Sequence, residues 1–383
     1  MIKSFQIFFI VGAFWGVAYG QGLESASIEA YPLWSLERGF PAPEEIGQPE
    51  VITYVRVNRA VENESQFLHG AAIVYYKQKF YACWANSPIN ENSGEESVRV
   101  KVSTDGGCTW GNVRTIAPDL PGMRRRSHGV FWVHDDRLWF FGANFGGADQ
   151  PLKEGRIYFA GLQTEAFVLN EKDGDWRSVQ VAVEDFWPLD EPAKMKDGNW
   201  ILGGIDKNFK AAVAVVPKDD ILNWQVIKIP QPEKKHYAES SVWVDGKVIQ
   251  AIMRNQSGKC AAISISKDCG RTWSRARETN YPMAASKPYA GMLTTGQRYL
   301  VSNLQNRNYL TIAVSKPQEQ CLSKIWMIRR GVSRQPLYKG WGKRPQWSYP
   351  YAYEHEGRLY VVYSVGKEDC ELAIIPLSCL YCD

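Results

Sequence analysis

Short runs of alternating apolar and polar residues, separated by turns, make up most of this chain of 383 residues. Alternation with a period of two is typical of a half-buried β-strand. Segments with the 3.6-residue period of a helix are nearly absent, because few long runs lack a Gly or Pro. The pattern therefore predicts an all-β protein.

One small pattern recurs six times: a turn, then Lys, Arg or Asn, then a pair of bulky apolar residues. The copies begin at Lys79, Arg137, Asn199, Lys247, Arg298 and Arg358. They follow one another at intervals of about 50–60 residues, a length that suits a repeat built from strand pairs. Six copies predict a six-bladed β-propeller, with a β-sandwich or a two-domain all-β protein as the alternative.

Two turns share a longer motif, S-x-D-x-G-x-T-W, at Ser103–Trp110 and Ser266–Trp273. Asp in a turn can accept hydrogen bonds from nearby backbone amides, and Gly supplies a positive φ. The motif resembles the Asp box of the sialidase superfamily, a hairpin turn repeated around a β-propeller. The resemblance implies that Asp105 and Asp268 lie in outer hairpin turns and have a structural role.

The N-terminus is typical of a secretory signal peptide over residues 1–20. Lys3 is followed by an apolar stretch, residues 5–18, and by a small-x-small cleavage site. A membrane anchor is the alternative, but the apolar run is short for a spanning helix. Residues 21–50, rich in Pro and Glu, are expected to be a lead-in that supplies the closing strand, and residues 51–383 the propeller. The protein is thus predicted to be secreted, to the periplasm or the extracellular space.

Charge and cysteine content narrow the choice of partners. A formal net charge of +4 is too weak and too dispersed to indicate a nucleic-acid partner, and no later stretch is apolar and long enough to span a membrane.

The eight cysteines suit an oxidising compartment, and the preferred disulfides are Cys83–Cys108 and Cys260–Cys269. Cys379 and Cys382 form a CxxC without a second ligand pair, so neither a metal nor another cofactor is predicted.

The candidate catalytic and binding residues are polar residues near the predicted strand ends, because ligand sites in propellers form at one mouth of the channel. Glu239 and Arg254 flank one hairpin, so they can lie at the same end of neighbouring strands. His69 and His128 fall at matching offsets from their hairpins and are expected to line one mouth. Further candidates along the chain are Lys287, Asn303, Arg307 and Tyr349.

The order of these residues resembles bacterial sialidase-type propellers, most closely the BNR-repeat, sialidase-like branch with a His in the first blade. The resemblance covers about Phe67–Pro376. It implies that Arg254 and Arg307 grip a substrate carboxylate, that Tyr349 is the nucleophile and that Glu239 activates it. Two guanidiniums can hold one carboxylate through charge-assisted bonds, and a Tyr needs a nearby base at neutral pH.

Two departures from the sialidase pattern leave the substrate open. His69 stands where sialidases have the first Arg of the clamp, and the acid/base Asp has no match. The loop in its place offers Glu91 as the nearest carboxylate. The acidic sugar could therefore be sialic acid or a uronic-type sugar, and His69 could itself transfer protons.

The sequence therefore predicts a secreted glycoside hydrolase of sialidase type that removes a terminal acidic sugar from glycans. Lys287, Asn303 and His128 complete the predicted substrate-binding set. His69 or Glu91 is expected to face Glu239 and Tyr349 across a gap wide enough for a sugar. The alternatives are a non-catalytic carbohydrate-binding propeller and a His-dependent hydrolase or lyase.

Each candidate also has a structural alternative. Arg254 and Arg307 could lie on a solvated rim, and Glu239 could pair with Lys234 or Lys235. Tyr349 belongs to an alternating run of tyrosines and could serve only as strand packing.

Overall fold

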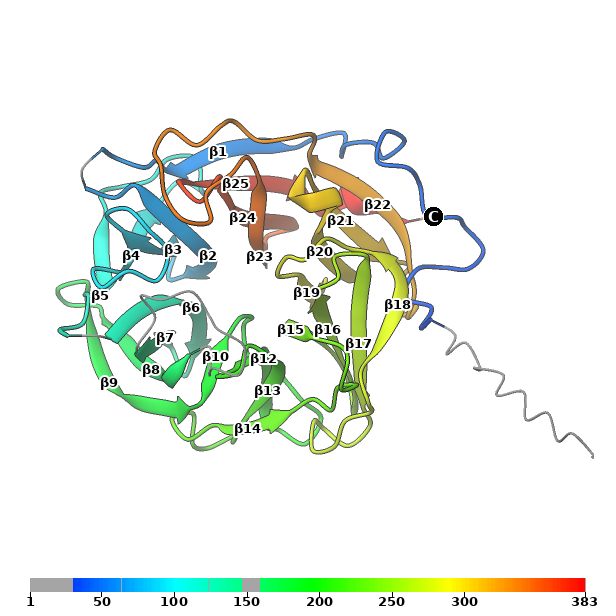
Figure 1. The fold of residues 1–383 in the computed structure, drawn as a ribbon, viewed down its shortest axis with the longest axis horizontal. Coiled ribbons are helices and arrows are strands. Elements are labelled where there is room, and N and C mark those ends of the chain that lie inside the picture. Colours follow the sequence, from blue (N-terminus) through cyan, green and yellow to red (C-terminus); the bar gives the residue numbers. More distant parts are fainter. Residues whose placement is uncertain (1–29, 63, 123, 147–158, 383) are drawn as a thin grey trace, which may run out of the picture.

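The computed structural model describes residues 30–62, 64–122, 124–146 and 159–382, so the predicted signal peptide lies outside it. Within these residues, six antiparallel sheets are arranged in a ring around a central axis (Figure 1). Each sheet is one blade, with four strands in five blades and a short fifth strand in the third. The predicted six-bladed, all-β propeller is confirmed.

The strands follow the chain blade by blade, from the channel outward. Blade 1 contains β2 (Phe67–Tyr76), β3 (Lys79–Ser87), β4 (Ser97–Ser103) and β5 (Arg114–Ala117). Blade 2 contains β6 (Arg124–His134), β7 (Arg137–Gly146), β8 (Ala160–Asn170) and β9 (Asp175–Glu184). Blade 3 contains β10 (Phe186–Pro188), β11 (Ala193–Lys194), β12 (Trp200–Asp206), β13 (Ala211–Val216) and β14 (Gln225–Lys228).

The second half of the chain repeats this arrangement. Blade 4 contains β15 (Tyr237–Asp245), β16 (Val248–Asn255), β17 (Cys260–Ser266) and β18 (Arg277–Pro282). Blade 5 contains β19 (Tyr289–Met292), β20 (Arg298–Leu304), β21 (Tyr309–Ser315) and β22 (Leu322–Arg329). Blade 6 contains β23 (Trp347–His355), β24 (Arg358–Val365), β25 (Asp369–Pro376) and β1 (Thr53–Asn58). Two 3-10 turns complete the described elements, η1 (Gln305–Arg307) and η2 (Leu377–Leu380).

The sixfold sequence pattern marks the start of the second strand from the channel in every blade. The strands β3, β7, β12, β16, β20 and β24 all begin at a copy of the pattern or one residue after it. Each copy lies where the chain turns back after the first strand, and the bulky pair that follows enters the core. Turn chemistry followed by apolar alternation was therefore a sufficient local signal for the blade repeat.

Blade 6 is closed by a strand from the other end of the chain. β1 pairs antiparallel with β25, with Thr53 opposite Ile374 and Val55 opposite Leu372 (Figure 1). The expectation that residues 21–50 supply this strand is wrong, because β1 begins only at Thr53. The described part of the lead-in instead runs along blades 4 and 5, where the amides of Leu33 and Trp34 donate to Asn280 Oδ1 at 2.9 and 2.8 Å.

The two S-x-D-x-G-x-T-W turns have the same geometry. Asp105 Oδ1 accepts from the Ser103 hydroxyl at 2.8 Å and from the Thr109 amide at 2.9 Å. The turn at Asp268 repeats these bonds with Ser266 and Thr272 at the same distances. Both turns join the third and fourth strands of a blade, so their predicted outer position is confirmed.

Aromatic side chains fill the contacts between blades. Phe80 of blade 1 packs on Tyr360 of blade 6, with ring centroids 4.3 Å apart. Trp132 of blade 2 lies edge-on to Trp200 of blade 3 at 5.0 Å. Such contacts bury large apolar areas between twisted sheets and fix the angle at which neighbouring blades meet.

All eight cysteines are free thiols, so both predicted disulfides are wrong. Cys83 points into the core from the middle of β3, whereas Cys108 is exposed in a turn. Cys260 begins β17 and Cys269 lies beyond its other end, and a strand of this length keeps them roughly 20 Å apart. In the described part of the chain, no helix has the length and apolar character needed to cross a membrane.

Candidate active site

The first strands of four blades carry a β-bulge near their start, at one end of the channel. The pairing register shifts between His69 and Ala72 in β2, Arg126 and Gly129 in β6, Ala238 and Ser240 in β15, and Ser348 and Tyr351 in β23. A bulge inserts an unpaired residue and re-aims its side chain. The candidate residues His128, Glu239 and Tyr349 all lie within these bulges.

The bulges place two candidate residues in a strained backbone conformation. Glu239 has φ 43° and Tyr349 has φ 54°, both in the left-handed region that costs a non-Gly residue about 1–3 kcal/mol. Such strain persists only where the surroundings impose it, and it clusters at functional sites. In blade 1 the equivalent position is Gly70, with φ 61°.

Tyr349, Glu239 and Arg254 form one hydrogen-bonded network across the channel. The Tyr349 hydroxyl donates to Glu239 Oε1. Arg254 Nη1 donates to Glu239 Oε2 at 2.8 Å and to the Tyr349 oxygen at 3.3 Å. The structural alternative for Glu239 is wrong, because Lys235 pairs with Glu278 at 2.7 Å.

Burial governs the protonation of this network. It raises the pKa of Tyr349 above its ordinary value, and the neighbouring Glu239 carboxylate raises it further, while Arg254 and Arg307 lower it. The balance leaves the hydroxyl protonated at neutral pH. A phenolate can therefore form only as the proton moves to Glu239, which already accepts the hydroxyl's hydrogen bond.

Arg307 reaches Tyr349 from blade 5. Its guanidinium carbon lies 5.7 Å from the centre of the Tyr349 ring. The Nη atoms donate to Gln346 Oε1 at 3.0 Å and to the Ala285 carbonyl at 2.7 Å. Arg307 is therefore buried and Arg254 partly buried beside Tyr349, rather than on a solvated rim, and the Nε of each lacks a hydrogen-bond partner among the described residues.

His69 covers the other side of Tyr349. The two ring centroids lie 4.0 Å apart, with Nδ1 of His69 3.1 Å from the Ser364 hydroxyl. Nε2 of His69 is buried without a hydrogen bond to any described residue and lies 3.9 Å from Glu91 Oε1. The predicted sugar-wide gap between His69 and Tyr349 is wrong, because the bulge of β23 turns Tyr349 against the imidazole.

The second histidine lies next to the first, with the rings of His69 and His128 6.0 Å apart. The Trp187 indole N–H points at His128, 3.2 Å from Nδ1 and 2.9 Å from the carbonyl oxygen. Burial, followed by Lys287 and Lys367, lowers the pKa of His128 to about 3. Burial also holds the pKa of His69 well below its usual range. Both imidazoles are therefore neutral at pH 7.

Glu91 lies at the same mouth but is held by a residue that the sequence reasoning missed. Its Oε2 accepts a hydrogen bond from Lys367, which follows β24. Glu96, farther along the same loop, is 1% exposed, and burial and then Glu91 keep its pKa well above the usual range. This side of the site thus combines a carboxyl paired with Lys367 and a fully buried carboxyl. Lys367 has no distinguishing sequence pattern and is brought here only by the turn that joins β24 to β25.

The two remaining candidates support the backbone beside the network. Lys287 Nζ donates to the Pro350 carbonyl at 2.8 Å, and burial lowers its pKa to about 8. Asn303 is completely buried and donates from Nδ2 to the Trp347 carbonyl at 3.0 Å. Lys287 thus steadies the bulge of β23, and Asn303 ties blade 5 to the start of that strand.

The arrangement supplies proton acceptors, proton donors and cations. Among the described residues, no group of three or more His, Cys, Asp or Glu side chains is placed to hold a metal ion. A Tyr, a carboxylate base, two Arg and a neutral His around one point can bind an acidic ligand and move protons at it.

The sequence pattern of the BNR repeat-like domain matches residues 78–361. No curated protein matches the chain in sequence.

Solved sialidase structures share the fold. The Hadza microbial sialidase Hz136 superimposes with a TM-score of 0.65 at 15% identity, over 85% of this chain and 68% of that one. The Trypanosoma rangeli sialidase in complex with sialic acid gives 0.63 at 13% identity, over 88% and 60%. A leech intramolecular trans-sialidase gives 0.65 at 9% identity, over 86% and 71%. At such identities the likeness concerns the fold.

Proposed function

The chain belongs to the family of BNR repeat-like domains, and on this premise we propose that it is a sialidase-like glycoside hydrolase. Its substrate is a glycan with a terminal acidic sugar, either sialic acid or a uronic-type sugar. The observation that carries the proposal is the network of Tyr349, Glu239 and Arg254 at the mouth of the channel. Because residues 1–20 read as a signal peptide, we expect the activity outside the cytoplasm.

The proposed reaction proceeds in two steps. The Tyr349 oxygen bonds to the anomeric carbon while Glu239 takes the hydroxyl proton, and the glycosidic carbon–oxygen bond breaks. The departing oxygen receives a proton from the side of the site that holds His69 and Glu91. Water then attacks the anomeric carbon and the bond to Tyr349 breaks. Glu239 returns its proton to the Tyr349 oxygen, and the water's proton restores the group that protonated the departing oxygen, so the anomeric configuration is retained.

The acidic character of the substrate is inferred from the two arginines. Arg254 is already paired with Glu239, whereas Arg307 has only neutral hydrogen-bond partners among the described residues. A buried guanidinium that lacks a counter-ion favours a ligand carboxylate. We therefore expect the substrate carboxylate to bind nearest Arg307, between the two guanidiniums.

The substitution Tyr349→Phe tests the hydrolase directly. It removes only the hydroxyl, so we expect the loss of at least about three orders of magnitude in turnover, with little change in glycan binding or melting temperature. Reducing-sugar release from sialylated and uronate-terminated oligosaccharides measures the turnover, and calorimetry measures binding. Substrates whose carboxylate is capped as an amide are the control, and they should bind poorly to the unsubstituted protein.

A second candidate function rests on His69. Its buried, neutral Nε2 has no hydrogen bond to a described residue and lies beside Tyr349. In a uronate lyase this nitrogen would take the proton from the carbon next to the carboxylate. The carbon–oxygen bond at the adjacent carbon would break, a double bond would form, and Tyr349 would give its proton to the departing oxygen.

The product distinguishes the two reactions. A lyase consumes no water and leaves an unsaturated acid that absorbs ultraviolet light, whereas a hydrolase leaves a saturated sugar. His69→Ala should abolish the lyase and leave measurable hydrolase turnover. If the unsubstituted protein binds acidic glycans but forms neither product, the protein is a carbohydrate-binding module and both enzymatic proposals fail.

A further inference from the structure

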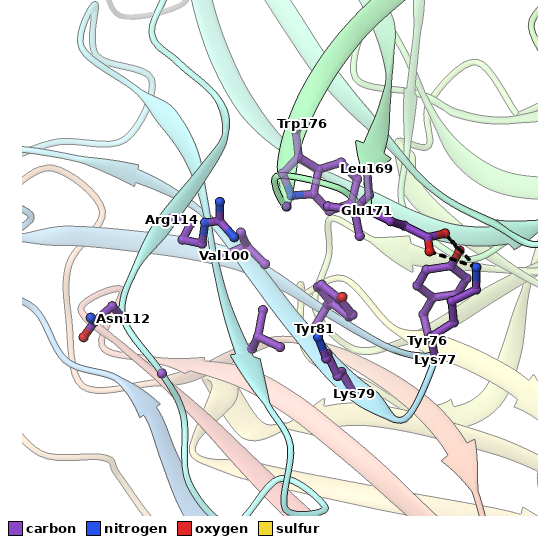
Figure 2. A pocket seen from close by; sticks show the side chains of 13 residues that line it. Tyr76, Lys77, Lys79, Tyr81, Val100, Asn112, Arg114, Leu169, Glu171 and Trp176 are labelled. Atoms are coloured by element: carbon purple, nitrogen blue, oxygen red, sulfur yellow. Dashed lines mark hydrogen bonds and ion pairs between the residues drawn. The ribbon is translucent and has the colours of Figure 1, made fainter.

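A second hollow lies at the junction of blades 1 and 2, far from the mouth that holds Tyr349. Its volume is about 370 Å³, and Figure 2 shows its lining side chains. They come from the turn between β2 and β3, from β4, from the segment before β5 and from the turn between β8 and β9. β2 runs from His69 at the mouth to Tyr76 at this hollow, a span of roughly 20 Å. We call this hollow the blade 1–2 pocket.

Aromatic rings form part of the pocket wall and are held in place. Tyr81 is 8% exposed and lies between the Arg114 side and the Tyr76 side of the pocket (Figure 2). The Trp176 ring is half-buried and is backed by Phe131 at 5.9 Å. Rigid aromatic faces bind the apolar faces of ring-shaped ligands at little cost in conformational entropy.

Most of the charges around the pocket are already paired. Lys77 binds Glu171 at 2.7 Å. Arg114 donates from Nη2 to Asp175 at 2.9 Å. The Tyr76 hydroxyl lies 2.5 Å from Glu171 Oε1 and 2.7 Å from the Asp136 carbonyl oxygen. These bonds hold the walls in place and leave few groups available to a ligand.

Two exposed polar residues at the pocket remain available. The Lys79 ammonium makes no ion pair, and the Asn112 amide no side-chain hydrogen bond, with any other residue in the described part of the chain. The lining therefore combines aromatic faces, one unpaired cation and one free amide. An ammonium suits a carboxylate, an amide suits hydroxyl groups, and the rings suit the carbon face of a sugar.

We propose that the blade 1–2 pocket is a second, non-catalytic glycan-binding site that takes one acidic sugar residue of a polymer. Its volume falls in the range of small-ligand sites, and Lys79 would bind the sugar carboxylate. One polymer bound here and at the mouth of the channel would raise the local concentration of substrate. Glycan binding in this pocket requires no chemistry at Tyr349, so it can be tested independently of the proposed hydrolase activity.

The test is native gel electrophoresis in gels that contain polygalacturonate or polysialic acid, with the neutral polymer galactomannan for comparison. All variants carry Tyr349→Phe so that the polymer is not degraded. Lys79→Glu should raise the dissociation constant for an acidic polymer about tenfold or more. The matched control is Lys247→Glu, because Lys247 is exposed in the corresponding turn of blade 4 and its substitution makes the same change in charge. It should leave retardation unchanged.

A second variant separates binding in the pocket from general charge. Asn112→Trp fills the pocket from its exposed rim without changing the charge and should also weaken retardation, at an unchanged melting temperature. The proposal is overturned if Lys79→Glu and Lys247→Glu act alike, if Asn112→Trp binds normally, or if the acidic polymers cause no retardation. Equal, Lys79-dependent retardation by polyglutamate would also overturn it, because the pocket would then read carboxylates on any polymer rather than a sugar.

Discussion

At the scale of single residues, burial decides which side chains of the channel carry charge. Glu239 is buried and Arg254 is partly buried, and their ion pair neutralises both charges. Lys287 is buried with a carbonyl as its hydrogen-bond partner, and the pKa of its ammonium falls to about 8. Burial lowers the pKa of both histidines, and nearby cations lower it further, so they contribute a neutral, polar wall.

The neutral histidines predict a loss of stability in acid. Burial lowers the pKa of His128 to about 3, below its ordinary 6.5. Between these values the unfolded chain binds a proton that the folded protein does not, so stability falls as pH falls from about 6.5 towards 3. The slope is at most about 1.4 kcal/mol per pH unit for each such histidine. His128→Gln should therefore flatten the dependence of unfolding free energy on pH between 6 and 4 by up to that amount.

Urea unfolding at several pH values measures this slope. His134→Gln is the control, because His134 lies at the far end of the same strand, away from the mouth. A slope that is unchanged by His128→Gln, or that is reduced equally by His134→Gln, would contradict the prediction.

At the scale of elements, the β-bulges turn a structural strand into part of a site. In a regular strand, successive side chains point to opposite faces of the blade. The bulges in β15 and β23 interrupt this alternation and direct both side chains towards one point. In β2 the same distortion places the backbone of Gly70 against the ring of His128.

Gly70→Ala tests how tightly the bulge of β2 fits the second histidine. A Cβ on Gly70 would lie 1.8 Å from His128 Cδ2, so the imidazole must move. Gly246 has the same φ of 61° but nothing within 4 Å of the added Cβ. Gly246→Ala should cost about 1 kcal/mol of backbone strain. Gly70→Ala should cost about 1–3 kcal/mol more through the overlap and should also weaken acidic-glycan binding.

Urea denaturation and glycan binding of the two variants measure these effects. Equal losses of stability in Gly70→Ala and Gly246→Ala would mean that the position of His128 does not depend on this contact.

At the scale of the whole molecule, the ring is closed by joining the two ends of the chain in blade 6. Besides the ladder to β25, β1 contacts blade 5 through Tyr54. Its hydroxyl donates to the Ile328 carbonyl at 2.7 Å, and the Arg329 guanidinium lies 3.6 Å from the centre of its ring. β1 therefore holds blades 5 and 6 together at the outer edge of the blade whose innermost strand, β23, carries Tyr349.

Removing β1 should open the propeller. A chain that begins at Arg59 leaves β25 as an exposed edge strand, which favours aggregation. A chain that begins at Glu50 keeps β1 and loses the lead-in, including the contacts of Leu33 and Trp34 with Asn280 and the buried side chain of Ile46. We expect the first to unfold at a much lower temperature and to self-associate in size-exclusion chromatography, and the second to stay monodisperse. Equal behaviour of the two chains would contradict the closing role of β1.

The sequence by itself determined the features that depend on neighbours along the chain. Turn chemistry at six regular positions predicted the blades, because a hairpin is specified by a few adjacent residues. The two Asp turns were predictable for the same reason, since Asp105 binds only residues within four positions of itself. The pairing of Glu239 with Arg254 was within reach because one hairpin joins them.

Only the tertiary structure decided the contacts that cross blades. Ring closure brings Tyr349 of blade 6 to Glu239 of blade 4, and sets His69 of blade 1 against the same ring. It also brings Lys367 to Glu91 and pairs β1 with β25. No local pattern encodes these contacts, because each depends on the angle between packed sheets and on bulges that re-aim single side chains. The protonation of the site follows in turn, since burial exists only once the ring is closed.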